Sequence, residues 1–419
     1  MNKTVLKVGF FLAFRQIKRA NIWTTGLIII VMALTFLNLV VVNGVLVGLI
    51  QGAIEANRAH YIGEVLVTSL KQKTYIENSQ TIFDIAKSLK GVDAVTGRYI
   101  GSAKVNADYR RKLRDDEVPN AAGTTLVGID PIAEDEVTGL SKFMIEGTYL
   151  DGNDTEGIMI GANLLYRFTP IDSSAFQSLR GIYVGDKLKI TVGKNAKEVV
   201  VRGIIKSKVD ENDFRVFMTA SEARKLLGRT DNNLNEVSIR MIPGASESDV
   251  IAVKQIFLNN GLDEGANIQT YDEALPKFVK DMKSMFALLG NLIGSIGLAV
   301  ASITIFIVIF VNTLTRRKFI GILKGIGIDS KAIEFSYILQ SIFYALAGAI
   351  VGFVILYGFL KPFVDAHPIN FPFSDGRIYA PLSGTFIRAA VLLFTTLIAG
   401  YIPARMIVNK NTLDSILGR

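Results

Sequence analysis

The sequence predicts an α-helical membrane protein with four transmembrane helices and an extracytoplasmic α+β domain inserted between the first and second helices. Half of the 419 residues are hydrophobic and the mean hydropathy is +0.36, above the usual value for soluble globular proteins. The apolar residues gather in four segments without formal charge. A region of ordinary charge content, residues 55–280, separates the first segment from the other three.

The four charge-free segments are residues 20–54, 284–315, 335–360 and 389–404. A helix crosses a hydrocarbon core of about 30 Å with about 20 apolar residues, because each residue rises about 1.5 Å. The first three segments exceed this length. The fourth has only 16 residues, and we expect it to extend outward through Thr385–Ile387, with Arg388 reaching the interface. Any one segment could be a buried core helix, but four together favour a membrane.

The first two transmembrane helices are expected to continue beyond the bilayer as stalks beneath the inserted domain. The first segment has 35 charge-free residues, which would span about 52 Å as a helix. No helix breaker follows Pro276 before the second segment. The first segment is also longer than the apolar core of a signal peptide, so we expect it to remain as a membrane anchor.

The distribution of charge predicts the orientation. Residues 1–24 contain five basic residues and no acid, and the loop at 315–334 has five bases and two acids. Residues 55–280 carry 29 bases and 32 acids, a net charge of −3, which leaves 17 bases and 6 acids for the rest of the chain. The positive-inside rule therefore predicts a membrane protein with cytoplasmic N- and C-termini. The basic pI near 9.3 reflects this membrane anchor and does not indicate a nucleic-acid-binding protein.

The expected organisation follows from these boundaries. It comprises a cytoplasmic amphipathic N-terminus (1–24), the first transmembrane helix and stalk (25–54), the extracytoplasmic domain (55–280) with an inserted subdomain at about 106–235, a stalk and second helix (281–314), a cytoplasmic loop (315–334), the third helix (335–360), an extracytoplasmic loop (361–381), the fourth helix (382–403) and a cytoplasmic tail (404–419).

Short strand-like runs alternate with amphipathic helices in the extracytoplasmic domain. A strand at Glu64–Thr68 precedes a helix that Ser79 is expected to cap, and Val92–Val105 resembles a pair of strands. Lys187–Val192 and Glu198–Ile205 alternate at period two, as in a β-hairpin. The pattern predicts an α+β or ferredoxin-like arrangement with an inserted, mostly-β subdomain.

No residue pattern predicts a catalytic site, a metal site or a cofactor in this chain. His60 and His367 are unpaired in the sequence, and the absence of cysteine excludes disulfides and thiolate ligands. The acidic run Glu134-Asp135-Glu136 lacks the ligand spacing of an EF-hand, and a helix start is the simpler interpretation. The P-loop pattern G-x-x-x-x-G-K-[ST] does not occur, so any ATP that drives this protein is expected on another subunit.

Glycines spaced by four residues mark smooth faces on three of the transmembrane helices. They are Gly44, Gly48 and Gly52 on the first, Gly290 and Gly294 on the second, and Gly348 and Gly352 on the third. Such faces allow close helix packing. Packing inside the four-helix unit and a dimer contact through the first helix are both compatible with this pattern. Asn38 and Asn43 lie at membrane depth, where hydrogen bonding across a helix interface is expected before substrate binding.

The cytoplasmic loop combines basic and apolar residues. Arg316, Arg317 and Lys324 accompany an apolar set that a purely solvated loop would not need: Ile320, Ile322, Leu323, Ile326 and Ile328. Exposed apolar residues on a short loop predict docking to a partner.

This loop resembles the coupling-helix signature of ABC transporter permeases of the MacB/FtsX/lipoprotein-releasing kind. The matching positions are Arg316 or Arg317, Ile320-Gly321-Ile322-Leu323 and Gly327, whereas the two glutamates of the family pattern are absent. Tyr401-Ile402-Pro403-Ala404-Arg405, followed by Leu413 and Leu417, is similar to the family's terminal motif. Val127-Gly128-Ile129-Asp130-Pro131, with Glu134 after it, resembles the lipoprotein-releasing branch. The resemblance extends over nearly the whole chain.

The resemblance implies a type VII membrane subunit of a bacterial inner membrane, which is itself not an enzyme. Arg316, Arg317, Ile320, Gly321, Ile322, Leu323, Lys324 and Gly327 would dock on a cytoplasmic ATPase dimer, which binds the ATP and Mg. A second permease subunit, identical or homologous, would complete the transporter, with a possible periplasmic carrier or adaptor. The implied mechanism is mechanotransmission, in which ATPase closure moves the extracytoplasmic domains to release a lipoprotein or another amphiphile. An FtsX-like regulator of a cell-wall hydrolase and a receptor without an ATPase are the alternatives.

Overall fold

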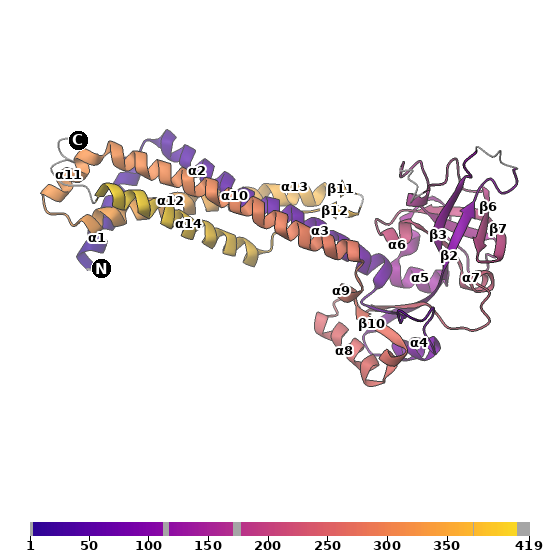
Figure 1. Ribbon diagram of the computed structural model, residues 1–419. Helices are drawn as coiled ribbons and strands as arrows, with labels where there is room; N and C mark the ends of the chain where they lie inside the picture. Colours follow the sequence, from indigo (N-terminus) through magenta and orange to yellow (C-terminus); the bar gives the residue numbers. More distant parts are fainter. Residues whose placement is uncertain (1–2, 112–116, 171–176, 372, 409–419) are drawn as a thin grey trace. The chain divides into compact units, whose positions relative to one another are not determined.

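The computed structural model describes residues 3–111, 117–170, 177–371 and 373–408. The chain divides into two compact units. The helical unit comprises Met1–Gln51, Asp281–Asn370 and Asp375–Arg419, and the sheet unit comprises Gly52–Lys280 with Phe371–Ser374 (Figure 1). Leu413 and Leu417, and with them most of the expected tail, lie outside the described residues.

Within the described residues, four helices are long and apolar enough to cross a membrane: Ile22–Ile62, Lys277–Thr315, Ser330–Ala366 and Leu382–Met406. The prediction of four transmembrane helices, with a domain inserted between the first two, is thus confirmed. The fourth candidate span has 25 residues and includes Thr385–Ile387. The third helix is longer than expected at both ends.

The first span is preceded by a separate helix, α1 (Lys3–Lys18). Asn21 begins the span, because its side-chain oxygen accepts the N–H of Trp23 at 2.9 Å. The span then runs through α2 (Ile22–Leu37), the π-helical turn η1 (Asn38–Val42), α3 (Asn43–Asn57) and the π-helical turn η2 (Arg58–Ile62). Gly63, with φ of 73°, ends it.

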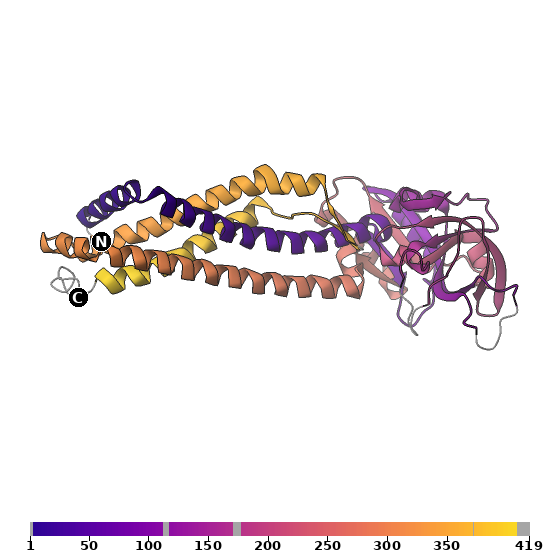
Figure 2. The same cartoon turned by 90° about the horizontal axis from the view of Figure 1, so that it is seen from above.

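The remaining elements of the helical unit are α10 (Lys277–Thr315), α11 (Arg317–Gly325), α12 (Ser330–Ile355), η6 (Leu356–Leu360), α13 (Lys361–Ala366), β11 (Ile369–Phe371), β12 (Ser374–Gly376) and α14 (Leu382–Val408). As predicted, α10 continues without a break from Lys277 into the second span. Helix α12 packs against α1, α2 and α14, and the long helices run side by side (Figure 2). A Cβ atom at Gly352 would lie 2.5 Å from Phe36 Cδ1, so the predicted glycine face of the third span is packed against α2.

The described residues of the sheet unit form a ten-stranded sheet. Its strands are β1 (Val65–Ser69), β2 (Val92–Asn106), β3 (Ala121–Ile129), β4 (Met144–Gly147), β5 (Gly157–Gly161), β6 (Lys187–Val192), β7 (Asn195–Ile205), β8 (Arg215–Thr219), β9 (Glu236–Met241) and β10 (Ala266–Thr270). The order is β10-β1-β9-β2-β3-β8-β5-β7-β4, and β6 pairs with β2 and β7. The predicted hairpin is therefore confirmed, as β6 and β7, with Gly193 at φ 56° in its turn.

The unit's helices are α4 (Ser79–Ser88), α5 (Pro131–Thr138), α6 (Asp210–Asp213), α7 (Ala220–Leu226), α8 (Glu247–Asn259) and α9 (Tyr271–Ala274), with short 3₁₀ turns η3 (Leu140–Phe143), η4 (Ala162–Leu164) and η5 (Leu262–Glu264). The sequence β1-α4-β2-β9-α8-β10, with sheet order β10-β1-β9-β2, is the predicted ferredoxin-like arrangement. The mostly-β insertion lies between β2 and β9.

Two local predictions for this unit were wrong. Val92–Val105 is not a pair of strands, because β2 is one strand of 15 residues that pairs with β9 in its first half and β3 in its second. Gly97 and Gly101 make no turn there. Because neither has a side chain, the side chains of Leu234 and Leu227 pack closely against the strand at these positions. Ser79 is not a cap but the first residue of α4, and its hydroxyl accepts the N–H of Leu234 at 2.8 Å.

Candidate functional site

The predicted cytoplasmic loop folds largely as a helix, α11. Its end is a Schellman motif, in which the N–H of Ile328 donates to Leu323 O and that of Gly327 donates to Lys324 O, both at 3.0 Å. Gly327 adopts φ of 91°, a conformation that costs a residue with a side chain about 1–2 kcal/mol. Asp329 then caps α12 by accepting the N–H of Lys331 at 2.9 Å. The structure thus gives Gly327 a role in ending this helix.

The two faces of α11 differ. Ile320 and Leu323 are 2% and 8% exposed and belong to the core of the helical unit with Ile333. The prediction that all the apolar loop residues are exposed is therefore wrong, because these two pack inside the chain. The opposite side presents Phe319, Ile322 and Ile326, which are 53%, 52% and 71% exposed. Among the predicted docking residues, Ile322 is thus the large apolar one left available to a partner.

The basic residues of the loop are partly used within the chain. Arg316 is the N-terminal flanking residue of α11, and Arg316 and Arg317 are half-buried. The ammonium group of Lys324 donates to the carbonyl oxygen of Val408, in the last turn of α14, at 2.9 Å. In that same helix Arg405 donates to the hydroxyl of Tyr401 at 2.8 Å. Two of the segments that carried the family resemblance, α11 and the end of α14, are therefore in contact. Gly321, between Ile320 and Ile322, is buried.

The glycine faces of the first and second spans are covered by the same chain. A Cβ atom at Gly48 would overlap the carbonyl oxygen of Arg377, and Tyr379 N–H donates to Gly44 O at 2.9 Å. A Cβ atom at Gly290 would overlap the Asn43 side chain, which also lies within contact distance of Gly294. Gly52 is half-buried. Packing within the chain thus fills the faces at Gly44, Gly48, Gly290 and Gly294, and a dimer contact through the first span stays a prediction.

The two membrane asparagines pack on glycines of α10 and do not hydrogen-bond to it. Asn43 Nδ2 donates to Leu39 O, one turn earlier in its own helix, at 3.1 Å. A Cβ atom at Gly297 would lie 2.7 Å from Asn38 Oδ1. Both side chains therefore occupy space that glycine leaves open, which is why these helices approach closely.

A second group of residues, in the sheet unit, holds the end of the first span. We call this group the helix-end clasp: Arg98 on β2, Asn212 on α6 and Ser238 on β9. Arg98 Nη2 donates to Tyr61 O at 2.8 Å, Asn212 Nδ2 donates to His60 O at 2.9 Å, and Ser238 Oγ donates to Ile62 O at 2.8 Å. The last carbonyls of a helix have no partner within it, so the clasp supplies three of the missing donors.

Arg98 is the centre of a buried charge network. Its guanidinium bonds both carboxylate oxygens of Glu134 at 2.7–3.1 Å, contacts Glu236 at 3.4 Å, and lies 4.5 Å from the ring centre of Tyr61. The side chains of Arg98 and Glu134 are 1% and 3% exposed. Burial by itself lowers the pKa of Arg98, but the charge and hydrogen bonds of Glu134 raise it above its usual value. Arg98 therefore keeps its positive charge inside the domain.

Asn212 is positioned by its neighbour Asp213. The carboxylate of Asp213 accepts the N–H of Ser207 at 2.6 Å and that of Lys208, a residue with positive φ, at 2.9 Å. Burial raises the pKa of Asp213 to about 6, against the opposing effect of these hydrogen bonds. The loop that carries one arm of the clasp thus depends on a buried carboxyl.

Sequence reasoning missed the clasp. The acidic run does stand at a helix start, as predicted, because Glu134 is in the first turn of α5, but the Glu134 side chain is buried and bonds Arg98 and Thr96. The one sequence signal for the clasp was Arg98, a basic residue within a strand-like run. The three clasp residues are 37 to 176 positions away from the carbonyls they bind, so only the sheet topology brings them together.

Neither histidine takes part in a cluster. His60 stands edge-on to Phe143 with ring centres 4.3 Å apart, and His367 lies against Phe363 at 5.2 Å. Within the described part of the chain, no three His, Cys, Asp or Glu side chains gather as metal ligands would.

The chain is similar to known permeases. Residues 291–412 match the family model described as FtsX-like permease C-terminal. An uncharacterized ABC transporter permease of Methanocaldococcus jannaschii is 27% identical over 341 residues, covering 79% of this chain and 77% of that protein. The macrolide export ATP-binding/permease protein MacB of Campylobacter jejuni is 22% identical over 311 residues, covering 71% of this chain but only 46% of MacB.

Two solved structures each align with about half of this chain. The periplasmic region of MacB from Actinobacillus actinomycetemcomitans covers 52% of this chain and 94% of that structure, at 11% identity and a TM-score of 0.35. The extracellular domain of YknZ, a noncanonic ABC-type transporter from Gram-positive bacteria, covers 49% and 98%, at 14% identity and a TM-score of 0.31. With the family match and the permease relatives, the conclusion is that the chain carries an FtsX-like permease domain and is homologous to MacB and other ABC transporter permeases.

Proposed function

We propose that this chain is the membrane subunit of an ABC transporter, and that it couples ATP hydrolysis by a separate cytoplasmic ATPase to movement of its extracytoplasmic domain. The observation that carries the proposal is α11. One of its faces is packed into the helical unit through Ile320 and Leu323, and the other presents Phe319, Ile322 and Ile326. A helix anchored on one side and apolar on the other is suited to receive a push from a docked partner.

The ATP-binding site is proposed on another chain. The relative MacB is named as an ATP-binding and permease protein, and the match covers less than half of it. The 419 residues contain no P-loop pattern. ATP and Mg would thus be bound by the partner, and Arg317 and Ile322 would face it.

The helix-end clasp supports the mechanical part of the proposal. A movement of the first span is passed on to the strands only if the end of its helix is held firmly. Within the sheet unit, three side chains from three elements hold the carbonyls of His60, Tyr61 and Ile62. The motion would serve release or export of a lipoprotein or other amphiphile. Two permease subunits and a periplasmic carrier or adaptor complete the proposed assembly.

Co-purification tests the proposal. The Ile322→Asp variant of the intact protein is expected to lose its ATPase partner, because a charge at the centre of an apolar contact costs about 2 kcal/mol or more, roughly 30-fold in affinity. The matched control is Ile251→Asp on α8, since Ile251 is also 52% exposed but lies in the sheet unit. The wild-type chain recovering no ATP-binding partner, or both variants retaining it equally, would contradict the proposal.

Crosslinking from residues 106–235 addresses the substrate. Capture of a lipidated protein or its carrier supports release of an amphiphile. Capture of a peptidoglycan hydrolase instead would replace this function with regulation of the cell wall, while leaving the ATPase coupling in place.

A further inference from the structure

Helix α1 is held on α12 along one narrow face. The residues Gly9, Ala13 and Gln16 are spaced by four and three, and all three are buried. A Cβ atom at Gly9 would lie 2.8 Å from Phe335 Cδ1 and 2.9 Å from Ala332 O, so the helices are close at this point. Two turns later, Gln340 Nε2 donates to Gln16 Oε1 at 2.6 Å. The position of α1 is therefore fixed at two points.

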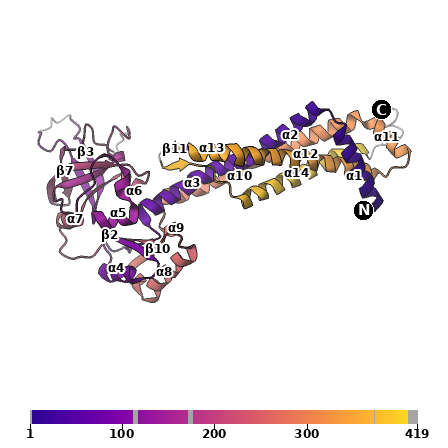
Figure 3. The same ribbon diagram turned by 180° about the vertical axis from the view of Figure 1, so that it is seen from behind.

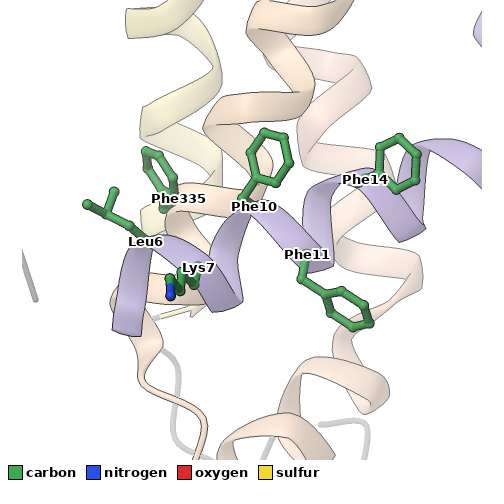
Figure 4. A pocket seen from close by; sticks show the side chains of 6 residues that line it. All are labelled: Leu6, Lys7, Phe10, Phe11, Phe14 and Phe335. Atoms are coloured by element: carbon green, nitrogen blue, oxygen red, sulfur yellow. The ribbon is translucent and has the colours of Figure 1, made fainter. Parts of the chain in front are cut away.

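The rest of α1 exposes aromatic side chains. Phe10, Phe11 and Phe14 are 64%, 58% and 62% exposed. Together with Leu6, Lys7 and Phe335 of α12 they line an open groove of about 470 Å³ (Figure 4). This volume is within the range of about 300–1,000 Å³ that small-molecule sites occupy. Lys7 is the one charged residue among those that line the groove.

The groove is on the helix that directly precedes the first candidate span, where a bilayer is expected to change from hydrocarbon to headgroups. The span begins at Ile22, and Trp23, the only tryptophan of the chain, is 84% exposed in its first turn. Tryptophan at the end of a span marks the headgroup level. Only three residues separate Lys18, the end of α1, from Ile22. Helices α1 and α11 lie at the same end of the helical unit (Figure 3).

The charge of residues 1–24 indicates which kind of molecule the groove binds. Residues 1–24 contain Lys3, Lys7, Arg15, Lys18 and Arg19 without any acid. Across the described residues, none of these five bases forms an ion pair with an acidic side chain. A basic, aromatic helix surface at the headgroup level complements an anionic lipid, whose phosphate attracts the bases while its chains cover the rings.

We propose that the groove between α1 and α12 binds one anionic phospholipid of the adjoining leaflet. The ammonium group of Lys7 binds the headgroup phosphate, and an acyl chain lies along Phe10, Phe14 and Phe335. The lipid would fill the groove beside the contact at Gly9, and would hold α1 on α12 at the end of the helical unit that also carries α11.

Native mass spectrometry of the intact chain in detergent micelles tests this site. The affinity for the first molecule of phosphatidylglycerol is compared with that for phosphatidylcholine of the same acyl chains. Phosphatidylglycerol is expected to bind more tightly to the wild type. The Lys7→Gln variant is expected to bind it about five-fold more weakly, with phosphatidylcholine unchanged, since a basic residue near an anionic lipid contributes about 1 kcal/mol.

The matched control is Lys18→Gln, which removes the same charge from the same helix about 16 Å farther along its axis. Both lysines are exposed, so neither variant is expected to change the thermal unfolding midpoint. Equal weakening in the two variants would mean diffuse attraction and would overturn the site. Equal affinity of the wild type for the two lipids would overturn it as well.

Discussion

Removing one member of the buried Arg98–Glu134 pair should destabilise the folded sheet unit. The Glu134→Leu variant leaves the guanidinium of Arg98 with one carboxylate partner, Glu236, at 3.4 Å, in a position that is 1% exposed. It also removes the acceptor of the Thr96 hydroxyl, 3.0 Å away. The charge then remains buried and largely uncompensated.

The expected cost is about 3–5 kcal/mol, the usual effect of removing one partner of a buried ion pair. Changing both residues, Arg98→Met with Glu134→Leu, removes the charges together and should recover more than half of this loss. The recovery is incomplete because Tyr61 O loses the donor that Arg98 provides. The carboxylate of Glu236 still accepts a hydrogen bond from the Tyr61 hydroxyl, which lies 2.8–2.9 Å from its two oxygens.

Hydrogen exchange of the backbone amides of β2, in the intact protein, measures the opening free energy. A loss of about 3–5 kcal/mol lowers their protection by roughly two to four orders of magnitude. The control is Asp93→Leu at the exposed pair Arg240–Asp93, whose 2.6 Å distance is similar but whose side chains are 40% and 38% exposed. There the change should be under about 1 kcal/mol. Similar effects at the two pairs would refute the assignment of the stability to burial.

Two further outcomes follow from local geometry. Gly327→Ala should loosen the end of α11 by about 1–2 kcal/mol, seen as faster exchange of the Ile328 amide, because φ is 91° while nothing lies within 4 Å of the added Cβ. Gly325→Ala, equally free of contacts but inside the helix, should slow that exchange or leave it unchanged, and the same loosening in both would contradict this account. Burial raises the folded pKa of Asp213 to about 6, above the ordinary 3.8, so protonation stabilises the native state, and the stability of the wild type relative to Asp213→Asn should fall by about 2 kcal/mol as the pH rises from 4 to 7. Thermal unfolding at a series of pH values measures this difference, and a constant difference would refute it.

The topology could be predicted because its signals are local. Charge-free length gives the four spans, and a breaker such as Gly193 lies directly between the strands that it separates. The βαββαβ order of the sheet unit likewise follows from elements in chain order. The long strand β2 was missed because a glycine in a strand-like run can indicate either a turn or a close packing contact. Gly97 makes a packing contact with Leu234, a residue 137 positions away.

The sites were harder to predict because a spacing defines a face but not what covers it. Glycines four apart on α3 and α10 predicted close packing. The backbone at Arg377 and the Asn43 side chain occupy these faces, and no sequence pattern around either residue indicates this contact. The same applies to α11. Its spacing does not show which apolar residues are buried, because this depends on its packing in the core that contains Ile333 and Val408. The proposed docking surface is therefore the part of the family signature that stays exposed once Ile320 and Leu323 are packed in the core.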